Sequence, residues 1–108
     1  MAVYVDRLRN WGWKYGPSCH LYADTNEELH AFAARLGLKR KWFQPSPSGP
    51  HYDLTASTRQ LAVIYGVTEH TDREMVEHMR AWRERAMARI EACHTEEERD
   101  AVRKELYR

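Results

Sequence analysis

The chain has 108 residues, a length that suits one domain with one hydrophobic core. Hydrophobic residues make up 43% of it and charged residues 31%, which is the composition of a globular protein rather than a disordered one. No apolar run approaches the roughly 18 residues that a membrane-spanning helix needs, so the sequence argues against a membrane protein.

Charge and aromatic residues are unevenly distributed along the chain. Residues 1–68 carry eight Lys and Arg against five acidic residues, whereas residues 69–108 carry nine against eleven, within a formal net charge of +1. Ten of the twelve aromatic residues also fall in the first 68 positions. We therefore expect the ligand-facing surface to be formed by the N-terminal part.

The two cysteines and the N-terminus bear on the cellular compartment. Cys19 and Cys93 lie far apart in sequence, in no paired metal-ligand spacing, which gives no support to a disulfide scaffold or a zinc ribbon. The first residues form a β-like run without the basic and apolar regions of a secretory signal. We expect a cytoplasmic protein, in a bacterium or a phage-infected cell.

The N-terminal part alternates between strand and helix signals. Residues 2–5 and 19–23 predict strands, separated by a loop rich in aromatic and basic residues. Thr25 and Glu28 form a capping box that starts a helix, and Gly37 ends it. A further short strand is predicted at 42–44, an exposed proline-rich turn at 45–50, a second helix at about 56–65 and a brief strand at 67–69.

The C-terminal part is predicted to be helical throughout. Thr71 with Glu74 opens a long amphipathic helix, and Thr95 with Glu98 opens a shorter one. We therefore predict an α/β (or α+β) core at 1–70, with a small sheet of three to four short strands and two packed helices. Residues 71–108 form a helical extension that packs on the core or on another subunit, which would make the protein a homo-oligomer.

One group of polar residues lies near the predicted strand ends and helix starts, where α/β folds usually bind ligands. Its members are Asp6, His20, Asp24, His30, His51 and Asp53. Imidazoles and carboxylates suit zinc, manganese or iron, although these spacings match no recognised ligand motif. Unrelated polar residues, each satisfied by its own hydrogen bonds, are the alternative.

A second group combines aromatic faces with cations, as nucleotide sites and single-stranded nucleic-acid sites do. It comprises Trp11, Trp13, Lys14, Tyr15, Lys39, Arg40, Lys41, Trp42 and Arg59. The alternative is that the tryptophans fill the core while the cations are solvated. Double-stranded DNA is an unsuitable ligand, because no helix carries a basic stripe free of acids.

Two patterns in the long helix have ordinary explanations as well. His70, Glu74 and His78 are spaced by four residues but lack the metalloprotease motif, and side-chain pairing on a solvated helix face accounts for them. A stripe that includes Met75, Met79 and Trp82 could bind a partner helix, although a core or dimer seam is the commoner role.

Five sequence blocks together resemble the domain-of-unknown-function 4031 family of phage and bacterial proteins, over roughly residues 1–68. They are Met1-Ala-Val-Tyr-Val-Asp6, Cys19-His-Leu-Tyr-Ala-Asp24, Glu27-Glu-Leu-His-Ala-Phe32, Trp42-Phe-Gln44 and His51-Tyr-Asp-Leu54. The resemblance implies no established reaction. The positions that its motifs carry are Asp6, His20, Asp24, His30, Trp42, His51, Tyr52, Asp53 and Arg59.

Three functional hypotheses follow. The first is a phage-type accessory protein that needs no cofactor and binds a small anionic, nucleotide-like ligand, for example to sequester a host defence signalling nucleotide. Its expected ligand-binding residues are Trp11, Trp13, Lys14, His20, Lys41, Trp42, His51, Tyr52, Asp53 and Arg59.

The second hypothesis is a metal-dependent hydrolase of a phosphoester or nucleotide. His20, His51 and Asp53 would hold a divalent metal such as zinc or manganese, and Asp6 or His30 would serve as the base. The third is a protein-binding adaptor that uses the helical stripe.

Overall fold

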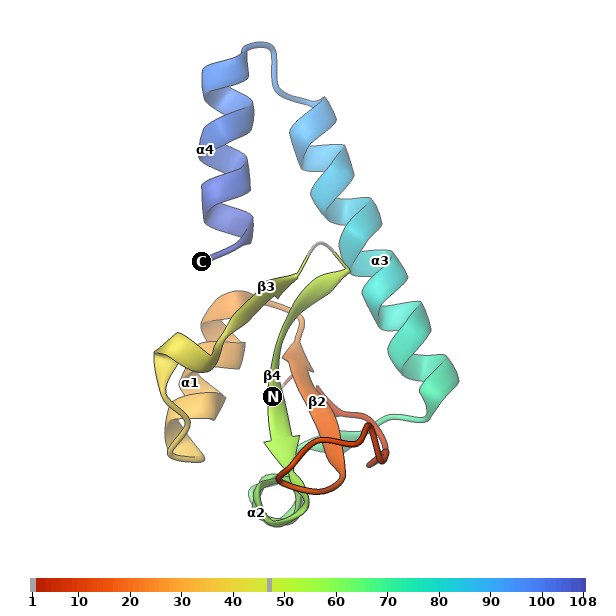
Figure 1. Ribbon diagram of the computed structural model, residues 1–108. Coiled ribbons are helices and arrows are strands. Elements are labelled where there is room, and N and C mark those ends of the chain that lie inside the picture. The colour runs from red at the N-terminus through yellow and green to blue at the C-terminus, as the bar shows by residue number, and fades with distance from the viewer. Residues whose placement is uncertain (1, 47) are drawn as a thin grey trace.

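The computed structural model describes residues 2–46 and 48–108 and shows a mixed α/β fold (Figure 1). Within these residues one five-stranded sheet has the strand order β3-β4-β2-β1-β5. The strands are β1 (Val3–Val5), β2 (Ser18–Ala23), β3 (Gln44–Ser46), β4 (Gly49–Thr55) and β5 (Thr68–Glu69). The α-helices are α1 (Asn26–Arg35), α2 (Ala56–Ile64), α3 (Asp72–Glu91) and α4 (Glu96–Leu106), and a short 3-10 helix spans Arg40–Trp42.

The register of the strands divides the sheet into an apolar face and a polar face. Strand β2 is antiparallel to both β1 and β4, whereas β5 joins β1 in parallel. Leu21 is paired with Tyr52, and His20 is paired with Asp53. Because successive side chains of a strand point to opposite faces, the first pair lies on one face and the second pair on the other.

The apolar face and the helices α1 and α2 enclose the hydrophobic core. Val3, Val5, Leu21 and Leu54 are fully buried there, together with Leu29 and Phe32 of α1 and Ala62 of α2. Complete burial of an aliphatic or aromatic side chain contributes about 1.5–3 kcal/mol, so this face provides most of the folding free energy.

Helix α3 lies across part of the polar face, on the side of the sheet opposite α1 (Figure 1). The ring of Tyr4 in β1 stacks on His70 with the centroids 4.3 Å apart, and the hydroxyl of Tyr22 is hydrogen-bonded to Nδ1 of His70 at 2.8 Å. His78 contacts both tyrosine rings and lies 3.1 Å from a carboxylate oxygen of Asp24. The predicted solvated row is therefore only partly solvated, because both histidines pack on the sheet.

Helices α3 and α4 form a hairpin with a small core of its own. Trp82 and Ala86 of α3 pack against Leu106 of α4, so the predicted stripe is used within the chain along this segment. The side-chain amide of Asn26 donates to the carbonyl oxygens of Leu106 and Arg108 and ties α4 to the start of α1. Among the described residues no helix is both long and apolar enough to cross a membrane.

The predicted helices are confirmed closely, and the strands less so. Thr25, Thr55, Thr71 and Thr95 are the N-caps of α1, α2, α3 and α4. The strand expected at 42–44 is wrong, because Arg40–Trp42 form a 3-10 helix and the strand begins at Gln44. The proline-rich turn is in fact the β3–β4 hairpin, whose residue 47 lies outside the described residues.

Gly49 allows α3 to approach the β3–β4 hairpin closely. Its φ is +145°, and an added Cβ would lie 2.2 Å from Sδ of Met79. We predict that Gly49→Ala lowers the free energy of unfolding by about 1 kcal/mol more than Gly37→Ala, because Met79 must move away. Gly37 also has a positive φ, but the space around it is open. Urea denaturation measures both costs, and a smaller difference between them on a Met79→Ala background would confirm that Met79 contributes to it.

Burial of His70 against Tyr22 predicts a pH-dependent stability. Desolvation lowers the pKa of His70, against an opposing effect of Glu74. The unfolded chain therefore binds this proton at higher pH than the folded chain, and its contribution to stability is lost as the pH falls through about 6.5. We expect His70→Gln to reduce the loss of unfolding free energy on acidification. An unchanged difference between denaturation at neutral and mildly acidic pH would exclude this role of His70.

Candidate metal centre

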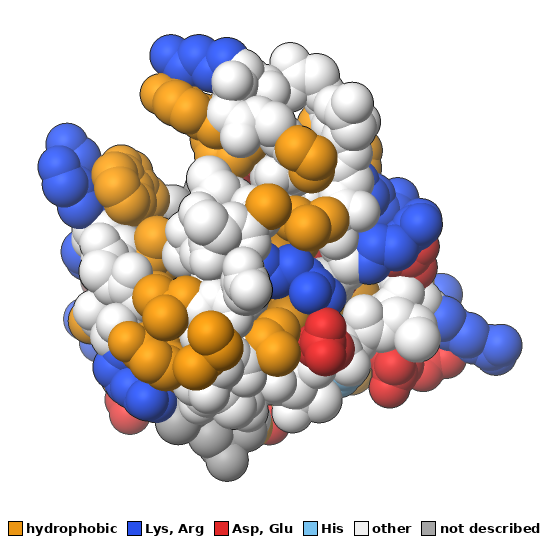
Figure 2. Space-filling view, turned by 90° about the horizontal axis from the view of Figure 1, so that it is seen from below, with side chains coloured by type: hydrophobic (Ala, Val, Ile, Leu, Met, Phe, Trp, Pro, Cys, Tyr) orange, Lys and Arg blue, Asp and Glu red, His pale blue; other side chains and the backbone are white. Residues whose placement is uncertain are grey.

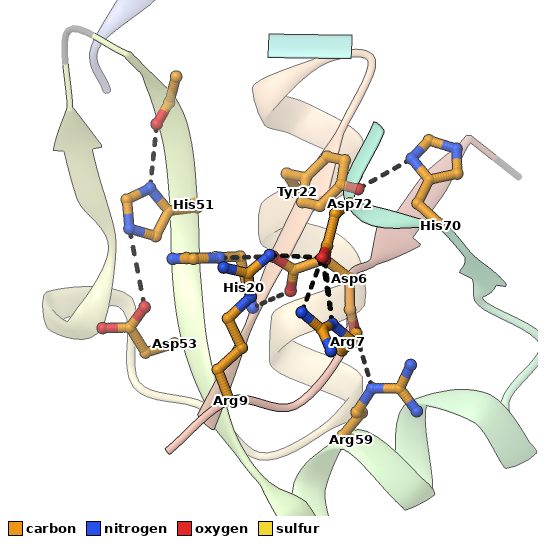
Figure 3. Close-up of polar contacts among 11 residues, drawn as sticks. Asp6, Arg7, Arg9, His20, Tyr22, His51, Asp53, Arg59, His70 and Asp72 are labelled. Atoms are coloured by element: carbon orange, nitrogen blue, oxygen red, sulfur yellow. Dashed lines mark hydrogen bonds and ion pairs between the residues drawn. The ribbon is translucent and has the colours of Figure 1, made fainter. Parts of the chain in front are cut away.

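Three metal-ligating side chains meet on the half of the polar face that α3 leaves uncovered (Figure 3). His20 comes from β2, and His51 and Asp53 come from the adjacent strand β4. Cross-strand pairing places Asp53 opposite His20, and the two-residue period of β4 brings His51 to the same face. One ligand atom from each lies within 4.8 Å of the other two, and Nε2 of His51 is 3.7 Å from Oδ1 of Asp53.

The buried carboxylate of Asp6 fixes the ring of His20. One oxygen of Asp6 accepts the backbone N–H of His20 at 2.6 Å, and the other accepts Nδ1–H of its ring at 2.7 Å. Asp6 is only 1% exposed, so these bonds compensate for the loss of water around its charge. The hydrogen bond to Asp6 raises the pKa of His20, against the opposing effect of burial. In the neutral ring, Nε2 is left with a free lone pair.

His51 is held in the same tautomer by a backbone group. Its Nδ1 lies 3.0 Å from the carbonyl oxygen of Gly49, which can only accept a hydrogen bond. Nδ1 therefore carries the proton, and Nε2 presents its lone pair toward Asp53. Both imidazoles thus have the arrangement common to metal-ligating histidines, in which the nitrogen that does not bind the metal donates to a carboxylate or a carbonyl.

The donor set fits a divalent transition metal. Two imidazole nitrogens and one carboxylate are a set found in catalytic zinc sites, where a water occupies the fourth position. Zinc lies about 2.0–2.2 Å from such ligands, so the three side chains would draw together slightly around an ion. Asp53 is the most exposed of the three, with 41% of its side chain accessible, and its position at the rim leaves an approach for a ligand.

Two pockets adjoin the three side chains. The first has a volume of about 490 Å³, and its lining includes Trp11, Trp13 and Gln44. The second has about 670 Å³, and its lining includes Trp13, Lys41 and Trp42. The amide of Gln44 donates to the carboxylate of Asp53. The structure therefore brings part of the aromatic and basic group next to the histidine and aspartate group.

Three residues expected in the site lie elsewhere. Tyr52 is 1% exposed and faces α1, where its hydroxyl is 2.8 Å from Nδ1 of His30. The sheet therefore separates His30 from the candidate centre, and neither residue contacts it. Arg59 donates from Nε to the backbone carbonyl of Asp6 and pairs with Glu69, so it supports the chain behind the site.

Asp6 was expected to serve as the base, but the structure gives its carboxylate another role. Both of its carboxylate oxygens are already bonded to His20, which makes it a residue that orients a ligand. Sequence reasoning missed Gln44 and the carbonyl of Gly49 because their roles depend on the β3–β4 pairing. Gln44 lies in the block that begins at Trp42, which is the one signal that could have drawn attention to it. Gly49 lies in none of the five blocks.

A salt-bridge cluster attaches the chain after β1 to the start of α3. Arg7 and Arg9 both contact the carboxylate of Asp72, with N–O distances of 2.9 and 2.6 Å (Figure 3). Hydrogen bonds from Arg9 and then Arg7 lower the pKa of Asp72. The two arginines lie within three residues after Asp6, so this cluster anchors the chain next to the candidate centre.

Comparison with known proteins identifies a family and nothing more specific. No curated protein and no solved structure matches the chain. A family model described as a protein of unknown function (DUF4031) matches residues 3–82. The match extends beyond the blocks at 1–68 into the first half of α3, so the family pattern includes part of the helix that crosses the polar face. The chain belongs to this family of proteins of unknown function.

Proposed function

We propose that this protein is a metal-dependent hydrolase of a phosphoester in a nucleotide-like ligand, and that His20, His51 and Asp53 hold a divalent ion such as zinc or manganese. The observation that carries the proposal is the orientation of both imidazoles by acceptors at Nδ1. Two Nε2 atoms and a carboxylate then converge beside a pocket.

The residues around the centre suit phosphoester hydrolysis. A divalent ion supplies Lewis acidity and activates water near neutral pH. Addition of water to a phosphodiester breaks one P–O ester bond and yields a phosphate monoester and an alcohol, with one hydrogen of the water leaving in the alcohol. Asp53, at the rim, would hold the ion through one carboxylate oxygen, while the amide of Gln44 donates to the other. Asp6 keeps the ring of His20 in one orientation, and Lys41 in the adjoining pocket can pair with the phosphate.

Ligand sequestration without turnover is the second candidate function. It is favoured by the pocket next to the centre, whose wall combines Trp13, Trp42 and Lys41. Aromatic faces can stack on a base while cations pair with phosphate. Under this proposal the protein binds a small anionic, nucleotide-like ligand and does not alter it chemically. A host defence signalling nucleotide in a phage-infected cell is an example of such a ligand.

Removal of a ligand side chain tests the metal centre. We expect the native protein to bind one equivalent of zinc or manganese in isothermal titration calorimetry and in native mass spectrometry. His51→Ala should abolish this binding, because only two ligands remain. His30→Ala is the matched control, since that histidine lies on the other side of the sheet, and it should bind metal normally. Equal binding by both variants would disprove the assignment.

Asp6 provides a test of the support around the centre. We predict that Asp6→Asn weakens metal binding by roughly ten- to hundredfold, because an amide cannot accept both hydrogen bonds from His20. Circular dichroism and thermal unfolding establish whether the variant is folded. In folded protein, nitrogen NMR of His20 should show a mixture of ring tautomers. An unaltered tautomer with unaltered affinity would exclude the orienting role.

Turnover separates the two candidate functions. The metal-loaded protein should cleave bis(p-nitrophenyl) phosphate, and His51→Ala should not. Under sequestration, a nucleotide ligand is instead retained and recovered intact by mass spectrometry after incubation with metal-loaded protein. Retention of intact ligand without cleavage would decide against the hydrolase.

A further inference from the structure

The two pockets beside the candidate centre are adjacent, and together we call them the groove. Both are lined by Trp13, Gln44 and Asp53, so they meet at these residues. The groove extends from His20 and His51 at one end to Trp42 at the other, where Thr55 and Thr58 complete its wall. Its parts have volumes of about 490 and 670 Å³, and each falls within the usual range for a whole small-molecule site.

The groove carries more exposed aromatic surface than one base requires. Trp11, Trp13 and Tyr15 of the loop between β1 and β2 are 59%, 38% and 61% exposed, and Trp42 is 48% exposed. The core is filled without them. The alternative that Trp11, Trp13 and Trp42 fill the core is therefore wrong. The end of the molecule where this loop and α2 lie (Figure 1) shows hydrophobic patches bordered by Lys and Arg side chains (Figure 2).

The cations near these rings are free to bind phosphate. Lys14 lies 5.0 Å from the centre of the Tyr15 ring, and Lys39 lies 5.6 Å from that of Trp42. Lys41 lines the groove itself. Within residues 2–46 and 48–108, no lysine forms an ion pair with an acidic side chain. Among the residues that the structure describes, Asp53 is the only acidic one that lines the groove, and it belongs to the candidate centre.

We propose that the ligand contains at least two unpaired nucleobases joined by a phosphodiester. One base stacks on Trp42, a second stacks on Trp13, and Lys41 lies close to the phosphate between them. This inference rests on the proposed function in one respect, which is that the phosphodiester lies next to His20, His51 and Asp53. A single nucleotide would use one aromatic wall and leave the other exposed. A duplex would hide its base faces, which stacking needs.

Binding in the absence of metal tests this proposal separately from hydrolysis. Tryptophan fluorescence of the full chain in EDTA would be titrated with thymidine monophosphate, the linear dinucleotide, an oligothymidylate of eight residues and a cyclic dinucleotide. We expect the linear dinucleotide or the cyclic dinucleotide to bind at least tenfold more tightly than the monophosphate. Preference for the linear dinucleotide and the oligomer would identify a nucleic-acid strand, and preference for the cyclic compound a signalling nucleotide.

Substitution of exposed aromatic residues locates the binding surface. Trp42→Ala and Trp13→Ala should each weaken binding of the preferred ligand by roughly five- to hundredfold, as expected for loss of one stacked base. Tyr65→Ala is the matched control, because Tyr65 is 38% exposed on α2 but lines neither pocket. It should bind normally, and circular dichroism verifies that each variant is folded.

The possible failures are distinguishable. Dinucleotide binding in EDTA does not depend on a metal. A protein that binds no metal and cleaves no ester could therefore still prefer the dinucleotide, so that failure of the hydrolase proposal leaves this one standing. Equal affinity for mononucleotide and dinucleotide would overturn the inference. The same holds for equal affinity for a duplex of the same length, for no binding by any of these ligands, or for equal losses in the Tyr65 and Trp42 variants.

Discussion

The fold around the candidate centre depends on one buried charge, the carboxylate of Asp6. An ionised carboxylate that is 1% exposed is unfavourable unless its oxygens are bonded, and here His20 satisfies both of them. The backbone bond fixes the end of β1 relative to β2, and the ring bond fixes the side chain of His20. Arg59 adds a bond to the carbonyl of Asp6 from α2. Three elements are thereby held at one residue, and the orientation of a prospective metal ligand follows from it.

The two faces of the sheet explain how one small domain can have both a core and a site. Aliphatic residues at alternate positions of β1, β2 and β4 are covered by α1 and α2. The intervening positions carry Tyr4, His20, Tyr22, His51 and Asp53 on the other face. The two tyrosines are covered there, whereas His20, His51 and Asp53 remain partly accessible. Because antiparallel pairing aligns residues of different strands directly, histidines far apart in the sequence need no spacing motif to meet. Cross-strand geometry is thus the reason that the separation of His20 and His51 gave no recognisable signal.

Local chemistry made the helices predictable, whereas pairing made the site hard to predict. The four threonine caps mark helix starts within the chain itself, so a single sequence locates α1 to α4 well. The grouping of His20, His51 and Asp53 followed from their residue types and from their places near predicted strand ends. The direction of each side chain did not. Tyr52 and Asp53 are neighbours in sequence, yet the first enters the core and the second the polar face, and the register of β4 against β2 decides between them.

Helix α3 determines which part of the polar face stays open. Its residue His78, together with His70 just before the helix, covers Tyr4 and Tyr22. The start of the helix is fixed by Asp72, which pairs with Arg7 and Arg9. Further along, Met79 passes close to Gly49. The backbone carbonyl of this same glycine accepts a hydrogen bond from Nδ1–H of His51. The position of α3 is therefore linked to the candidate centre at both ends of its contact with the sheet. At one end the link runs through Asp6 and the nearby arginines, and at the other end it runs through Gly49. The family match includes the first half of α3, which makes these contacts. Without that segment the tyrosines would be uncovered and the Gly49 hairpin would be unsupported.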